Sequence, residues 1–132
     1  MYDTYTYMVN GKKHSIFIKD NNTLPVQIHK EHTYLDMLQM DAALHRLTPE
    51  AFMLYSYFAL KPPNYIWAVS THNFEYMKPE DFECGFAELV SAGYIDCGAI
   101  KLHDRENYSE IERGYHFYEI PSRRSGNEHD ND

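Results

Sequence analysis

The sequence predicts an α+β domain that is mainly helical: a winged helix-turn-helix with an added N-terminal β-hairpin and helix. Two observations predict this class. Apolar residues recur at helical spacing in several segments between residues 34 and 92, and strand-like segments with alternating residues lie at both ends of the chain. From residue 48 onward the expected order is helix, strand, short helix, longer helix, strand, loop, strand, which is the order of a winged helix.

The N-terminal residues predict a hairpin and then a helix. Residues 5–9 alternate between apolar and polar side chains, and Asn10-Gly11 supplies the positive φ angles that a tight turn requires. Residues 16–18 are the expected return strand. Residues 34–46 place apolar side chains at helical spacing, so they predict the first helix.

The centre of the chain predicts a helix, a strand and a second, short helix. Thr48 is a good N-cap and is followed by a proline, which suits the first helical position of a helix over residues 49–60. Residues 66–69 are apolar and predict a short strand. Ser70 can then cap a short helix that ends near residue 76.

A longer helix and two strands complete the predicted domain. The helix begins near Pro79 and stops before Gly93, a good C-terminal stop. Its inward stripe is Phe82, Phe86, Leu89 and Val90. Residues 94–102 and 114–120 predict strands, and the polar segment between them predicts an exposed loop.

The domain boundary is expected near residue 121. No repeat or Ser/Gly-rich linker divides residues 1–121, so they predict a single domain. Residues 122–132 contain no apolar side chain that could pack against a core, and we expect them to form a disordered acidic tail.

Four short motifs, in this order along the chain, carry a family resemblance. They are Leu47-Thr48-Pro49-Glu50-Ala51, Pro62-Pro63-Asn64-Tyr65-Ile66-Trp67-Ala68-Val69-Ser70, Glu88-Leu89-Val90-Ser91-Ala92-Gly93-Tyr94-Ile95 and Tyr115-His116-Phe117-Tyr118-Glu119-Ile120-Pro121. Together, over about residues 47–121, they resemble the winged-helix N-terminal domain of Firmicute phage and plasmid replication initiator and replisome-organiser proteins. The resemblance implies a mobile-element origin. Two cysteines and a start that lacks the features of a signal peptide predict reduced thiols in the cytoplasm of the bacterial host.

Composition and motifs argue against several function classes. The chain has 132 residues and a net charge of -8, and no apolar run is long enough for a membrane span. It contains no Gly-rich phosphate loop, no Gly-x-Ser-x-Gly and no His-Glu-x-x-His, so we expect neither an enzyme nor a cofactor. His29 and His32 could share a helix face, but no second ligand pair follows at zinc-like spacing, and no metal site is expected.

Acidic residues gather where a winged helix would read DNA. Residues 71–93 carry five acids and a single lysine, on and beside the third helix. Charge of this sign is repelled by phosphate. The acids are Glu75, Glu80, Asp81, Glu83 and Glu88. We therefore expect a non-enzymatic accessory protein of a phage or other mobile element whose acidic face binds a basic protein surface. Inhibition of a host replication or defence nuclease, including an anti-CRISPR action, fits this charge.

The alternative hypothesis is a DNA-binding regulator or replication factor, as the resemblance implies. DNA contacts would then come from the start of the third helix, the wing loop and the segment after it. The basic residues at these places are Lys78, Arg105, Arg113, Arg123 and Arg124. Acids are interspersed with the arginines of the loop, which also fits a solvated loop of mixed charge.

Tyrosines in the first strand raise a third possibility. Tyr2, Tyr5 and Tyr7 fit either packing against a strand face or an interface, because tyrosine is enriched at protein contacts. A hairpin outside the helical core could also pair two copies of the chain, so a homodimer is a candidate assembly.

Overall fold

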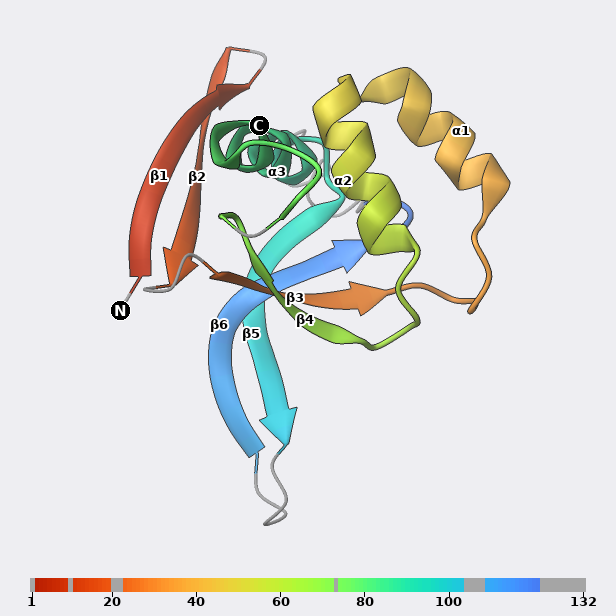
Figure 1. The fold of residues 1–132 in the computed structure, drawn as a ribbon. Coiled ribbons are helices and arrows are strands. Elements are labelled where there is room, and N and C mark those ends of the chain that lie inside the picture. The colour runs from red at the N-terminus through yellow and green to blue at the C-terminus, as the bar shows by residue number, and fades with distance from the viewer. Residues whose placement is uncertain (1, 10, 20–22, 73, 104–108, 122–132) are drawn as a thin grey trace, which may run out of the picture.

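The computed structural model describes residues 2–9, 11–19, 23–72, 74–103 and 109–121, which form three helices and six strands (Figure 1). In chain order these are β1 (Tyr2–Val9), β2 (Lys12–Lys19), β3 (Thr23–His29), α1 (Met37–Arg46), α2 (Pro49–Ala59), β4 (Ile66–Ser70), α3 (Pro79–Ser91), β5 (Ile95–His103) and β6 (Ser109–Tyr118). More of the described residues lie in strands than in helices, so the expectation of a mainly helical domain is wrong.

A mixed four-stranded sheet replaces the expected wing. Its strand order is β4-β3-β6-β5, with β3 antiparallel to β4 and parallel to β6, and β5 antiparallel to β6. Strand β3 separates β4 from the C-terminal hairpin, whereas no strand is predicted at this position from the sequence. The described residues between 71 and 78 form turns instead of the expected short helix, so no helix-turn-helix forms. The winged-helix prediction is therefore wrong.

A proline explains why β3 is not predicted from the sequence. Pro25 lies within the strand, and a proline there normally demotes a segment to an edge strand or loop because it cannot donate a ladder hydrogen bond. In the fold, Pro25 lies opposite Ala68 and its neighbours Leu24 and Val26 are fully buried. The apolar burial of the strand outweighs the missing donor.

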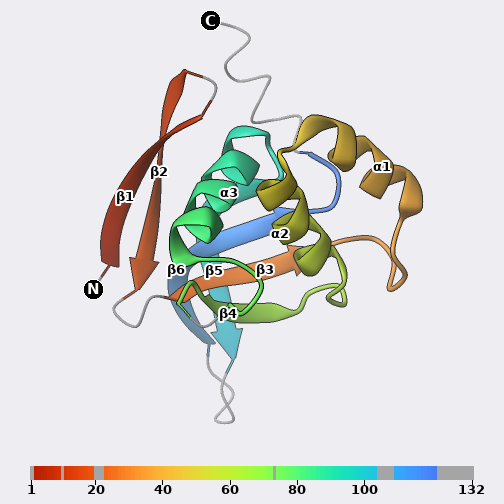
Figure 2. The same ribbon diagram turned by 45° about the horizontal axis from the view of Figure 1, so that its top comes forward.

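Helices α2 and α3 pack on one face of the sheet and enclose the core (Figure 2). The stripe expected on the third helix is buried, with Phe82, Phe86 and Leu89 at 0% exposure. Gly85 allows the two helices to approach closely, because a Cβ atom there would lie 3.2 Å from Leu54 Cδ1 and 3.3 Å from the Ala51 amide nitrogen.

The hairpin β1–β2 packs against α3 (Figure 1). Ile16 and Ile18 of β2 are buried in the same core cluster as the helix. Helix α3 thus has α2 and the sheet on some of its sides and the hairpin on another, and Ala87 of this helix is fully buried. This packing explains why α3 does not project as a reading helix would.

Among the described residues, no helix has the length and apolar character needed to cross a membrane.

Candidate functional site

The acids expected to form one face have different surroundings. Glu80 and Asp81 are exposed in the first turn of α3, where negative charge is favourable beside the helix dipole. Glu83 is half-buried and Glu75 is exposed in the turn region before the helix. Lys78, the basic residue of this segment, is exposed and occupies the N-cap position without a capping side-chain hydrogen bond.

Glu88 has a structural partner. Its Oε2 atom accepts a hydrogen bond of 2.9 Å from the Thr48 backbone N–H, and its Oε1 atom accepts one of 2.7 Å from the Thr48 hydroxyl. Thr48 is the N-cap of α2, so the carboxylate of α3 holds the start of the neighbouring helix. Thr48 and Glu88 are forty positions apart, so their contact is not visible in the sequence, and Glu88 was predicted to be a binding residue.

The other expected residues are only partly described. Arg113 is exposed on β6, whereas Arg105, Arg123 and Arg124 lie outside the described residues. The side chains of Tyr2, Tyr5 and Tyr7 also lie outside the described part, although their backbone belongs to β1. Of the five basic residues of this set, the structure describes Lys78 and Arg113, which lie on different elements.

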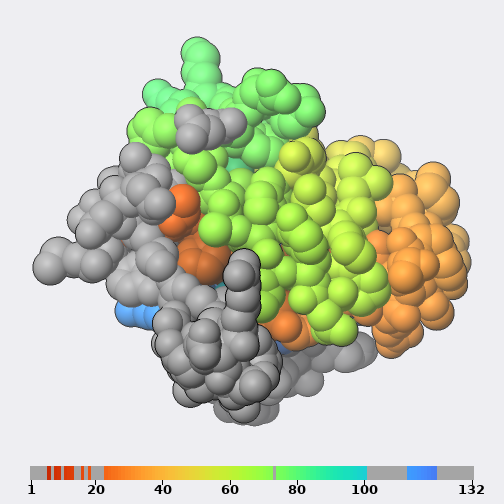
Figure 3. Space-filling model, turned by 60° about the horizontal axis from the view of Figure 1, so that its bottom comes forward, coloured from red at the N-terminus to blue at the C-terminus, as the bar shows by residue number. Residues whose placement is uncertain are grey.

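A groove of about 280 Å³ lies between α2, β4 and the turn that follows β4. Figure 3 shows the surface that α2, β4 and neighbouring segments form in yellow-green. Aromatic rings of the lining contact one another at centroid distances of 4.9 to 5.7 Å. The groove is lined by Tyr57, Trp67, Ala68, Val69, Ser70, Phe74, Glu75 and Tyr76.

Strand β4 is an edge of the sheet, and its outer side has no strand partner among the described residues. The Ile28 N–H donates to Tyr65 O at 2.8 Å, which fixes the phase of the antiparallel ladder. Because hydrogen-bonded pairs alternate along such a ladder, the N–H and C=O groups of Ile66 and Ala68 point away from β3. These groups are available to an added strand.

Charged groups flank the two ends of this groove. The Lys61 ammonium lies 4.7 Å from the ring centroid of Trp67, 4.9 Å from that of Tyr57 and 5.7 Å from that of Tyr65, a cation–π arrangement near the start of β4. Beyond the other end of the strand, the Glu75 carboxylate raises the pKa of the neighbouring Tyr76 hydroxyl.

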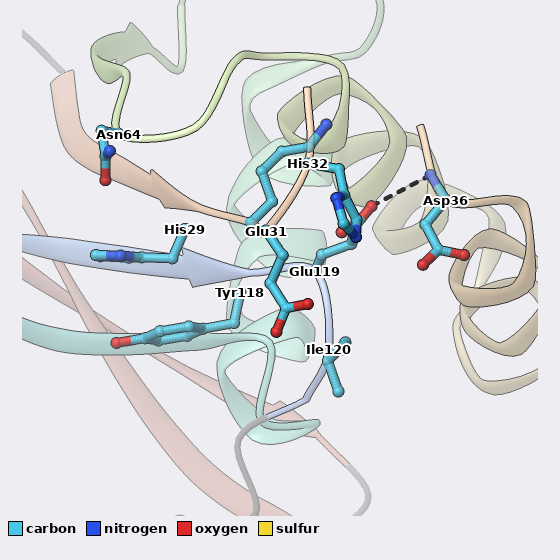
Figure 4. A pocket seen from close by; sticks show the side chains of 9 residues that line it. His29, Glu31, His32, Asp36, Asn64, Tyr118, Glu119 and Ile120 are labelled. Atoms are coloured by element: carbon cyan, nitrogen blue, oxygen red, sulfur yellow. Dashed lines mark hydrogen bonds between the residues drawn. The ribbon is translucent and has the colours of Figure 1, made fainter. Parts of the chain in front are cut away.

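A second hollow, of about 270 Å³, lies where β3 and β6 end (Figure 4). The two strands are parallel, so their carboxyl ends meet at the same edge of the sheet, where α/β sheets commonly bind ligands. The hollow is lined by His29, Lys30, Glu31, His32, Asp36, Asn64, Tyr118, Glu119 and Ile120.

A small ring cluster forms one wall of this hollow. His29 stacks on Tyr118 with centroids 4.9 Å apart, and its Nε2 atom lies 2.8 Å from His116 Nδ1. The His116 Nε2 atom lies 3.0 Å from Ala99 O, which fits an Nε2–H donor there and leaves Nδ1 to accept from His29. Burial, with His116 nearby as a secondary cause, lowers the pKa of His29.

Glu119 is the most buried carboxylate among the described residues of this hollow, with only 6% of the residue exposed. Its Oε2 atom accepts a long hydrogen bond of 3.4 Å from the Asp36 N–H, which links the sheet to the start of α1. Burial raises the pKa of Glu119, although Lys30 and His32 act in the opposite direction.

The described residues contain no group of three or more His, Cys, Asp or Glu side chains that could hold a metal ion. Cys84 and Cys97 are free and exposed. Comparison with known proteins found no matching family model, curated protein or solved structure. The resemblance to phage replication proteins therefore finds no support there.

Sequence reasoning missed both hollows, and the second of them depends on residues far apart in the chain. The groove joins α2 to β4 and to the turn after it, and the second hollow joins residues 29–36 to residues 118–120. A partial signal was present: Tyr57, Trp67, Phe74 and Tyr76 are concentrated within twenty residues.

Proposed function

We propose that this protein is a non-enzymatic binding protein that accepts a basic, extended segment of a partner protein along β4. The observation that carries the proposal is the open edge of β4 beside an aromatic groove that contains a carboxylate. Strand addition of this kind takes its affinity from main-chain hydrogen bonds and its specificity from side-chain pockets next to the edge. Trp67 and Tyr57 are suited to be the apolar anchors of such an interface.

Charge favours a basic partner. Phe74 packs on Phe82 at a centroid distance of 5.1 Å, so the segment carrying Glu75 lies against the first turn of α3, where Glu80 and Asp81 are exposed. Acids at this end of the groove, together with the net charge of -8, would speed the approach of a basic surface. Lys61 at the other end would repel a uniformly basic segment, so the partner's basic residues are expected toward Ser70.

Proteins that hold nucleic acid carry basic surfaces of the required sign. We therefore extend the proposal to a host protein of this class, whose nucleic-acid groove would be occupied and whose activity would be inhibited. This is the action expected of an accessory protein that counters replication or defence. The acids that would act in it are Glu75, Glu80 and Asp81, since Glu88 is engaged with Thr48.

Two octapeptides test the proposal directly, one alternating Lys with Val and the other alternating Glu with Val. Binding is measured by the shifts of the Ile66 and Ala68 amides in ¹⁵N–¹H NMR spectra. We expect the Lys peptide to shift them, and the Glu peptide to leave them in place. Equal shifts with both peptides would remove the charge argument, and the absence of shifts with either would contradict strand addition.

The variant Ala68→Pro removes one outward N–H without removing a hydrogen bond to β3, because proline lacks the donor. It should weaken binding of the Lys peptide about tenfold or more, since several ladder contacts depend on this position. Ala68→Val keeps the donor and is the matched control. Unchanged binding by the proline variant would show that the peptide does not use this edge.

A further inference from the structure

The hollow at the carboxyl ends of β3 and β6 has an acidic lining. It contains three carboxylates, from Glu31, Asp36 and Glu119, against one lysine, Lys30, and two histidines, His29 and His32. We propose that it is a binding site for a guanidinium group, carried by a small molecule or by an arginine of another protein. The site shares no lining residue with the groove beside β4, so the inference goes beyond the proposed function.

Glu119 is the residue that points most directly to a cationic ligand. It is more than nine-tenths buried, and its Oε2 atom has a single long contact to the Asp36 N–H. Its Oε1 atom has no hydrogen-bond partner among the described residues. A buried carboxylate is costly unless it is paired, and a ligand with two parallel N–H donors would satisfy it.

Lys30 does not fill this role. Its ammonium donates a hydrogen bond of 2.6 Å to Ala59 O at the C-terminal end of α2, where a cation is favourable. No ion pair joins Lys30 to Glu119 among the described residues. The lysine that lines this hollow is thus engaged with the helix end.

The remaining walls suit a guanidinium better than a compact ammonium. His29 and Tyr118 are stacked with an interplanar angle of 15°, and such rings offer faces to a planar cation. Ile120 supplies an apolar contact for an aliphatic stem. The volume of about 270 Å³ is at or below the lower end of pockets for drug-sized ligands, so it fits one side chain or a small molecule.

Arginine and citrulline form the decisive pair of probes, because they have nearly the same shape and only arginine is charged at its end. Each probe is titrated into the full chain, and its binding is measured by the NMR shifts of the amides of residues 29–32 and 118–120. We expect saturable shifts with arginine and at least tenfold weaker binding of citrulline. Equal behaviour of the two probes would overturn the proposal.

Two variants locate the charge in this hollow. Glu119→Gln keeps the shape of the buried side chain and should weaken arginine binding about tenfold, while exposed Glu31→Gln, which does not perturb the core, should weaken it less. Glu50→Gln, an exposed acid in the first turn of α2 that lines neither hollow, is the matched control and should leave binding unchanged. Loss of binding by Glu50→Gln to the same extent would show general charge attraction and overturn the site.

The source of the guanidinium is separated by a third probe, N-acetyl-arginine amide. If the site receives an arginine of another protein, this blocked form should bind at least as tightly as free arginine. If it receives a small molecule, agmatine or free arginine should bind more tightly than the blocked form. Either result supports a guanidinium site. Failure of arginine, agmatine and N-acetyl-arginine amide to bind contradicts it.

Discussion

Helices α1 and α2 are adjacent in the chain and similar in length, at 10 and 11 residues, but they contribute very differently to the fold. Helix α2 buries five residues, whereas α1 buries Ala43 alone. On α1, Met37, Leu38 and Leu44 are 69%, 81% and 54% exposed. Apolar residues at helical spacing therefore predict a helix, but they do not show whether its apolar face is covered.

The difference has a physical origin in what each helix meets. Helix α2 lies beside α3 on one face of the sheet (Figure 2), and its Phe58 contacts Phe86 of α3 and Phe117 and Trp67 of the sheet. Helix α1 packs mainly on α2 and is joined to the sheet by the contact between Asp36 and Glu119. We expect stability to depend on α2 and local opening to begin at α1.

The largest expected effect comes from Phe58→Ala. Phe58 is fully buried, at 0% exposure, so truncation should lower the free energy of unfolding by about 3–5 kcal/mol. Leu38→Ala on α1 is the control, with an expected change within about 0.5 kcal/mol. Urea denaturation followed by circular dichroism measures both. Similar losses for the two variants would erase the contrast between the helices.

The next effect concerns the start of α2. Glu88→Gln weakens the charged hydrogen bonds to Thr48 and should cost about 1 kcal/mol of unfolding free energy. Glu80→Gln, in the first turn of α3, should cost only about 0.3 kcal/mol. Thermal denaturation of the two variants gives the comparison. If the costs were equal, Glu88 would be acting through general charge and not through the cap.

The pH dependence of stability tests the role of Glu119, which joins the sheet to the start of α1. Folding raises its pKa above the usual value of 4.5, so the folded state favours the protonated carboxyl. That stabilisation is complete below the unfolded pKa and is lost as pH rises through the folded pKa. Glu119→Gln should therefore gain stability relative to the wild-type chain as the pH rises from below the usual value of 4.5 toward neutral. Denaturation curves across this range test it, and a constant difference would contradict the shifted pKa.

The smallest global effect is expected from Asp36→Ala. Asp36 caps α1 by accepting from the Leu38 and Gln39 N–H groups at 3.0 and 3.3 Å. Its loss should speed hydrogen exchange of the α1 amides about fivefold and leave those of α2 unchanged, because α1 can open alone. Faster exchange in both helices would show that they unfold as one unit.

Much of the local structure could be predicted because its signals are local. Asn10-Gly11 indicated the turn between β1 and β2, and Gly11 has the expected positive φ of 79°. Thr48 and Pro49 indicated the start of α2, and Thr48 caps it as expected. The arrangement of these elements was predicted wrongly, because the same order of helices and strands fits more than one sheet once β3 is added.

The binding surfaces depended even more on distant contacts. Glu88 was predicted to face a partner and instead caps α2. Glu119 had no special role in the sequence, because only the parallel pairing of β3 and β6 brings it beside Lys30 and Asp36. The acids Glu75, Glu80 and Asp81 remain exposed, as the charge pattern predicts for a binding face.

The sequence by itself determined the elements that short-range chemistry specifies: the hairpin turn, the N-cap of α2, the buried stripe of α3 and the net charge of -8. The tertiary structure decided where β3 pairs, which side of α3 the hairpin covers, and which carboxylates are engaged. The physical reason is range. Turns and caps depend on residues within a few positions, whereas sheet order and burial depend on contacts between segments that the sequence does not place side by side.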